Sequence, residues 1–75
     1  MDIQPLSKLR VKQKGVIAYL EVKNNSQMHK LMSIGALPGM HISLVQKFPS
    51  YVFFLGHSQF AVDKELAEAI RVKVG

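Results

Sequence analysis

The chain has 75 residues and no cysteine, which excludes a multidomain enzyme, a disulfide-stapled secreted protein and any metal site built on thiolates. Hydrophobic residues make up 48% and charged residues 20%, so we expect one small folded domain over residues 1–75. Ten basic and five acidic residues give a net charge of +5. This charge favours an acidic partner or phosphate groups.

The sequence shows no membrane-spanning or secretory segment. Its unbroken apolar runs, such as Tyr51 to Leu55, are far shorter than the roughly 20 residues that cross a bilayer as a helix. Residues 1–5 lack a basic region followed by an apolar region. We therefore expect a cytoplasmic protein that reaches the inner face of a membrane only through a partner.

Basic residues occupy every second position of an N-terminal segment, namely Lys8, Arg10, Lys12 and Lys14. In an extended chain this spacing places them on one face, opposite Leu9 and Val11, so we predict a half-exposed basic strand. This basic patch could follow phosphate groups or attract an acidic partner. The alternative is a solvated face whose lysines discourage edge pairing.

A strand and a helix are predicted next. β-Branched and aromatic residues favour a strand from about Lys14 to Val22. Apolar residues occupy both its odd and its even positions, as in a strand coiled into a small barrel or one that carries a bulge. Ser26 is expected to cap a helix from Ser26 to Ile34. Gly35 can end this helix, and Pro38-Gly39 place a turn before the next strand.

The second half of the chain alternates strand and turn signals. Strands are expected over 40–44, with Met40, Ile42 and Leu44 facing inward, and over 51–55 and 60–62, with a hairpin turn at Gly56-His57-Ser58. Asp63 can cap a short helix through Ala69, and residues 70–74 alternate as a closing strand. The sum is a mainly β fold, a small antiparallel barrel of about five strands with two short helices.

The most specific motif runs through residues 31–42, where Leu31, Ile34, Gly35, Pro38 and Gly39 form the spacing Leu-x-x-Ile-Gly-x-x-Pro-Gly. With Gly56, the segment Phe60-Ala61-Val62 and the closing strand, this pattern resembles the FeoA family of small ferrous-iron transport accessory proteins. The resemblance covers almost the whole chain and implies an SH3-like barrel. It also implies a partner, the cytoplasmic GTPase domain of a FeoB-type membrane permease.

Two positions depart from the family pattern: Lys12 stands where glycine is common, and Asp63 where a basic residue is common. The chain also resembles the C-terminal SH3-like domain of iron-dependent transcriptional repressors. Because it starts at Met1 with nothing before it, we expect a free-standing protein. Gly35, Pro38, Gly39 and Gly56 have architectural roles, so the motif predicts the fold directly and the function by analogy.

The residues that could carry other chemistry are few. His29, His41 and His57 are separated by 12 and 16 residues, and no carboxylate lies within three residues of any of them, so we predict no metal site and no cofactor. No catalytic motif is present, and we predict a protein that is not an enzyme. The rival hypothesis is a small basic barrel that binds nucleic acid.

The helix and the turn after it carry more apolar side chains than a short helix can bury on one side. We therefore predict a partner-binding surface there, formed by Met28, Leu31, Met32, Ala36 and Leu37. In the competing arrangement Leu31, Ile34 and Leu37 fill the barrel mouth, and only Lys30 and Ser33 are exposed. Homo-oligomerisation is left open.

Overall fold

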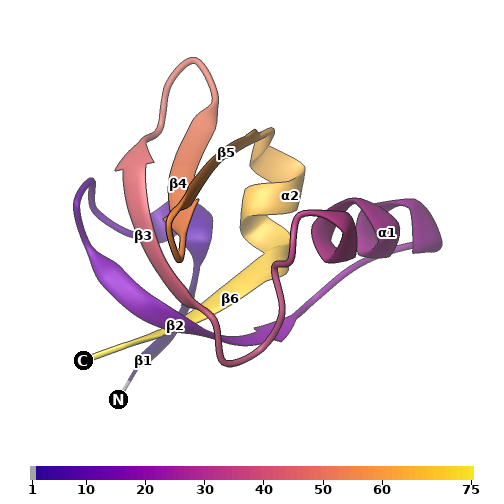
Figure 1. Ribbon diagram of the computed structural model, residues 1–75, viewed down its shortest axis with the longest axis horizontal. Coiled ribbons are helices and arrows are strands. Elements are labelled where there is room, and N and C mark those ends of the chain that lie inside the picture. The colour runs from indigo at the N-terminus through magenta and orange to yellow at the C-terminus, as the bar shows by residue number, and fades with distance from the viewer. Residues whose placement is uncertain (1) are drawn as a thin grey trace.

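Six antiparallel strands form one curved sheet in the order β1-β6-β2-β3-β4-β5 in the computed structural model, which describes residues 2–75 (Figure 1). The strands are β1 (Asp2–Pro5), β2 (Lys14–Leu20), β3 (His41–Gln46), β4 (Tyr51–Leu55), β5 (Ser58–Val62) and β6 (Ile70–Val74). Two short helices, α1 (Asn25–Ser33) and α2 (Lys64–Ala69), and a 3₁₀ turn, η1 (Leu6–Lys8), complete the chain. The predicted mainly β fold is confirmed, with one strand more than expected.

The additional strand, β1, pairs with the closing strand β6 in the register Asp2↔Val74 to Pro5↔Arg71. The predicted basic strand after it is wrong, because the chain turns through η1 and reaches β2 only at Lys14. Leu9 is fully buried as predicted, but Val11 is 48% exposed and does not share its face. The basic residues between β1 and β2 therefore lie on an exposed loop.

Strand β2 lies in the middle of the sheet, paired with β6 on one side and β3 on the other. Its register with β6 shifts between Ile17 and Tyr19, which confirms the predicted bulge. At Gly15 a methyl group would lie 2.7 Å from the carbonyl oxygen of Lys73 and 2.5 Å from Cγ1 of Val72. Only glycine allows β6 to approach β2 this closely.

The hairpin β4–β5 forms where its sequence predicts it. The pairing Leu55↔Ser58 leaves Gly56 and His57 as the two turn residues, and Gly56 has a φ of +58°, as the first turn position of a type II′ hairpin requires. The rings of Phe53 and Phe60 are 6.3 Å apart across the pair. Phe53 is fully buried, so this aromatic pair contributes to the core.

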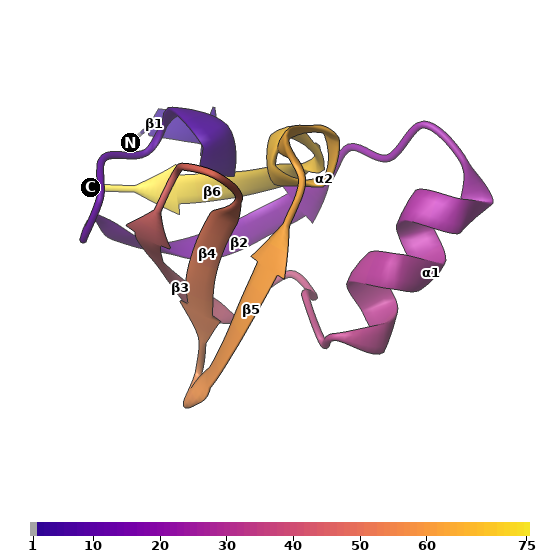
Figure 2. The same ribbon diagram turned by 90° about the horizontal axis from the view of Figure 1, so that it is seen from above.

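Helix α2 begins at the predicted cap: Oδ1 of Asp63 accepts a hydrogen bond from the backbone N–H of Leu66 at 2.9 Å. Its apolar side packs against the core at one end of the sheet, next to η1 and β6 (Figure 2). The core that results consists of aliphatic side chains and one phenylalanine, from every helix and strand except β1 and β5: Leu6, Leu9, Ile17, Leu31, Ala36, Ile42, Leu44, Phe53, Leu55, Leu66, Ala67, Ala69, Ile70, Val72 and Val74.

Candidate interaction surface

Helix α1 begins one residue before the predicted cap. Asn24, in extended conformation, accepts a hydrogen bond from the backbone N–H of Gln27 at 2.8 Å, whereas Ser26 lies inside the helix. The side chain of Gln27 reaches back to the N–H of Lys23 at 2.9 Å, so the two side chains satisfy two unpaired backbone donors. The spacing Asn24-x-x-Gln27 is the signal that predicts this start; the Ser26 cap is wrong.

The C-terminal end of α1 is fixed by the predicted glycine. Gly35 has a φ of +82°, its N–H donates to the carbonyl of Met32 at 3.0 Å, and the N–H of Ala36 donates to the carbonyl of Leu31 at 2.9 Å. These two bonds define a Schellman motif. The motif turns Ala36 into the core, where it is fully buried.

The turn after the helix is attached to the middle of the sheet. Gly39 has a φ of +94°, and the N–H of Met40 donates to the carbonyl of Leu37 at 3.1 Å, as in a type II turn with Pro38 in its first central position. Ile17 of β2 accepts from Gly39 at 2.8 Å and donates to Met40 at 2.9 Å. The position of the turn is therefore set by β2.

The five side chains predicted to bind a partner divide into two groups. Leu31 and Ala36 are fully buried, so they support the surface and cannot touch a partner. Met32 and Leu37 are 52% and 43% exposed, and Met28 is half-buried. The alternative arrangement, in which Leu37 fills the barrel mouth together with Leu31 and Ile34, is contradicted by the exposure of Leu37.

One further side chain belongs to this surface. Met40 was expected to face inward at the start of β3, but the strand starts at His41 and leaves Met40 in the turn, 37% exposed. We call the exposed and half-buried apolar side chains of α1 and its turn, namely Met28, Met32, Leu37 and Met40, the α1 patch. It combines three flexible thioethers with one leucine, a composition that adapts to a partner's shape.

The histidines lie on three different segments: His29 on α1, His41 at the start of β3 and His57 in the β4–β5 turn, all exposed. Across residues 2–75, no three histidine, aspartate or glutamate side chains gather closely enough to hold a metal ion. No helix in the same residues is long and apolar enough to span a membrane.

The basic patch is exposed at all four positions, but the loop does not arrange it as one face. Its backbone is tied to the sheet through Lys12, whose N–H donates to the carbonyl of Leu44 at 2.6 Å. Lys12 has a φ of +77°, a conformation that glycine adopts without strain.

Comparison with known proteins gives consistent results. A family model described as the FeoA domain matches residues 4–74. A crystal structure of an iron uptake regulatory protein (FeoA) is 27% identical, covers 97% of either chain and superposes with a TM-score of 0.87. A search of curated proteins found no match.

Two more distant structures define the fold. FeoA of Stenotrophomonas maltophilia, solved with zinc and described as an SH3 domain protein, is 22% identical with a TM-score of 0.79, covering 91% of this chain and 87% of that one. IdeR of T. acidophilum is 17% identical with a TM-score of 0.91, covering 100% of this chain and 35% of IdeR. Both likenesses show the fold alone, and they confirm the expected SH3-like architecture.

Proposed function

The chain belongs to the FeoA domain family, and from this premise we propose that it is a non-enzymatic accessory protein of ferrous-iron transport. In this proposal it acts by binding the cytoplasmic GTPase domain of a FeoB-type permease, which holds it at the inner face of the membrane. The family membership supports the transport role. The α1 patch supports a mode of action through protein contact.

The α1 patch is the observation that carries this proposal. A chain of 75 residues that leaves Met32 52% and Leu37 43% exposed gives up burial that it needs for its own stability. Exposed apolar patches on small proteins mark interaction sites. The backbone beneath the patch is fixed by the Schellman motif and by the bonds to Ile17, so the surface is preorganised and loses little entropy on binding.

Charge reversal within the patch tests the proposal. In Met32→Glu and Leu37→Glu, a carboxylate would have to be desolvated in the interface, so the affinity for the purified GTPase domain should fall by at least about tenfold. Val11→Glu is the matched control, because Val11 is 48% exposed and lies on the β1–β2 loop. Isothermal titration calorimetry measures the affinities, and circular dichroism shows whether each variant keeps its fold.

Three outcomes would contradict the proposal. Normal binding by both glutamate variants would exclude the α1 patch, and loss of binding in Val11→Glu as well would show that the added charge acts without regard to position. Absence of any binding by the unaltered chain would favour the rival classes. Sequence-specific nucleic-acid binding at physiological salt would then favour the nucleic-acid hypothesis, and binding to a repressor's DNA-binding domain would favour the repressor-type module.

A further inference from the structure

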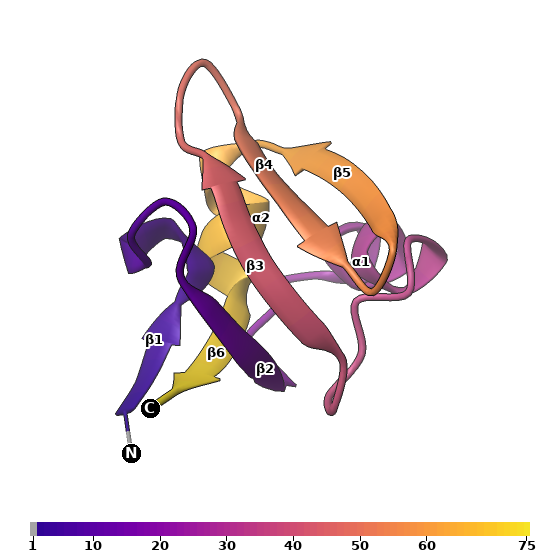
Figure 3. The ribbon, with the colours of Figure 1, turned by 60° about the vertical axis from the view of Figure 1, so that its left-hand side comes forward.

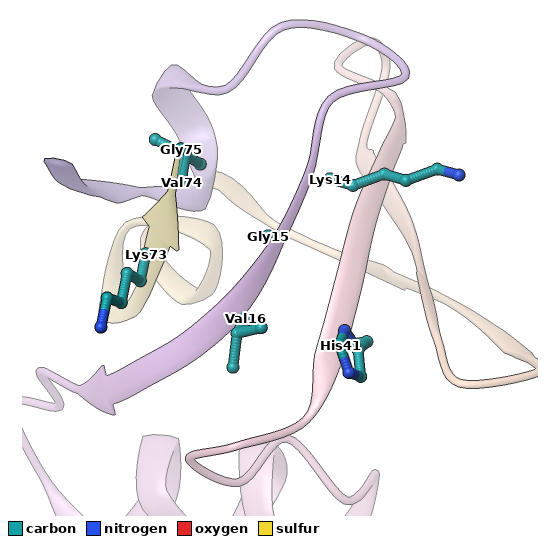
Figure 4. A pocket seen from close by; sticks show the side chains of 7 residues that line it. All are labelled: Lys14, Gly15, Val16, His41, Lys73, Val74 and Gly75. Carbon is teal, nitrogen blue, oxygen red and sulfur yellow. The ribbon is translucent and has the colours of Figure 1, made fainter. Parts of the chain in front are cut away.

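The outer face of the sheet carries a second surface, lined by other side chains than the α1 patch, although His41 in it directly follows Met40. Two adjoining hollows of about 430 and 460 Å³ lie along β6, β2, β3 and β4 and share Lys14, Gly15 and His41 (Figure 4). We call them together the sheet groove. None of the four side chains of the α1 patch lines either hollow. Figure 3 shows this face of the sheet in front, with α2 behind it.

The groove forms because strand pairing ends at different points on the two sides of β2. Its register with β6 stops at Val16↔Lys73, whereas its register with β3 continues to Lys14↔Ser43. The paired register of β6 with β2 therefore ends before Val74, although the two strands still lie close together at Gly15. In Figure 4 Val16 lies between Lys73 on one side and His41 on the other, so an apolar side chain is flanked by basic ones.

Charge is distributed unevenly around the molecule. Lys14 and Lys73 are exposed at the groove, and none of the side-chain carboxylates among residues 2–75 lines it. Three of the five carboxylates, Glu21, Glu65 and Glu68, line a different hollow beside α2. The side chains that line the sheet groove thus include two lysines and no carboxylate of the described residues.

We infer that the sheet groove binds an extended, acidic segment of a partner protein. In an extended segment side chains alternate between two faces, so an apolar residue can contact Val16 and Phe54 while neighbouring carboxylates reach Lys14 and Lys73. Phe54 is 40% exposed and lines the second hollow. Charge complementarity selects the acidic sequence, and the apolar contacts supply the affinity.

A protein segment fits the groove better than a nucleic acid does. Single-stranded nucleic acids bind where successive aromatic side chains stack on the bases, and Phe54 is the one phenyl ring that lines the described groove. Two lysines displace few counterions, so they would bind a phosphate backbone only weakly. The apolar floor at Val16 has no complement in a phosphate backbone.

A short fluorescent peptide that alternates glutamate or aspartate with leucine or phenylalanine tests the inference by fluorescence anisotropy at physiological salt. The control peptide has the same sequence with every acid replaced by its amide. The variant Lys14→Glu/Lys73→Glu should weaken binding of the acidic peptide by at least about tenfold. The matched control, Lys47→Glu/Lys64→Glu, changes the net charge equally at exposed positions outside the groove and should leave the affinity within about twofold.

Thermal unfolding shows whether the charge-reversed variant Lys14→Glu/Lys73→Glu is folded. If it is not, Lys14→Gln/Lys73→Gln replaces it and should still weaken binding of the acidic peptide. Three results would overturn the inference: equal affinity for the amide peptide, equal losses in the groove and control variants, or tighter binding of oligothymidylate than of the acidic peptide. Met32→Glu should bind the peptide normally, so failure here is distinguishable from failure of the proposed permease contact.

Discussion

Both helices of this protein are capped by a side-chain oxygen at the N-terminus, yet they are packed into the molecule to different extents. Helix α2 has six residues and buries Leu66, Ala67 and Ala69, whereas α1 has nine and buries Gln27 and Leu31. Figures 1 and 2 show α2 against one end of the sheet, between the strands and α1, and α1 projecting away from it. Helix α2 is therefore part of the core.

Helix α1 is held mainly at its ends. At its start the side-chain N–H of Gln27 donates to Glu65 of α2 at 3.4 Å, and at its end the Schellman motif and the following turn connect it to β2. Between these ends Leu31 is the fully buried apolar contact. The difference between the two helices indicates that α2 serves stability, whereas α1 and its turn leave apolar side chains exposed.

The largest expected effect tests whether one side chain holds α1 against the core. Leu31→Ala should reduce the free energy of unfolding by about 2–5 kcal/mol, because it leaves a cavity beneath the helix. Met32→Ala, one residue away and 52% exposed, should change it by less than about 0.5 kcal/mol. Urea denaturation measures both. A loss at Met32 as large as at Leu31 would show that the α1 patch is structural.

Removal of each helix cap should affect different parts of the molecule for the two helices. Asp63→Ala and Asn24→Ala each remove one hydrogen bond to a backbone N–H and should cost about 0.5–2 kcal/mol of helix stability. The loss at Asp63 should lower the global stability, because α2 belongs to the core. The loss at Asn24 should appear as faster hydrogen exchange confined to residues 25–33. If both variants lower the global stability, the two helices do not differ in how they are packed into the core.

A further comparison concerns two positions with positive φ, one at the end of α1 and one on the β1–β2 loop. Gly35→Ala forces a methyl group into the left-handed conformation that ends α1 and should cost about 1–2 kcal/mol, although nothing lies within 4 Å of the added atom. Lys12→Gly removes a similar strain on the β1–β2 loop and should stabilise the protein by less than about 1 kcal/mol. Differential scanning calorimetry compares the two. A stabilising Gly35→Ala would contradict the account of this helix end.

The sequence predicts the elements whose causes are local. The strand at Tyr51–Leu55, the turn at Gly56 and the Asp63 cap follow from residues within a few positions of one another. The Gly35 helix end and the Pro38-Gly39 turn are of the same kind. Each depends on backbone preferences that the neighbouring sequence determines almost alone.

The elements that the sequence did not reveal depend on distant partners. Strand β1 has no alternating pattern and is fixed by its pairing with β6, seventy residues along the chain. The neighbouring sequence gives no reason for glycine at position 15, because the requirement comes from the close approach of β6. The period-two lysines and arginine resemble a strand although a 3₁₀ turn and Lys12 in a left-handed conformation interrupt the segment.

The helix and turn that carry the candidate surface were predicted, but the burial of their side chains was predicted only in part. The helix and turn were identified correctly, but Leu31 and Ala36 are buried and Met40 is exposed. The apolar pattern alone could not divide these side chains, because the Schellman motif decides that Ala36 turns inward. The sheet groove was not predicted, since it brings together Lys14, His41 and Lys73 from three strands.

The footprint of the permease's GTPase domain on this protein tests the central claim most directly. Titration of the isotopically labelled chain with that domain, followed by amide chemical shifts in NMR spectra, reports every contacted segment at once. The account predicts the largest changes over residues 28–40, in the α1 patch and its turn, with α2 unaffected. Changes confined to other segments, or none with the domain in excess, would contradict it.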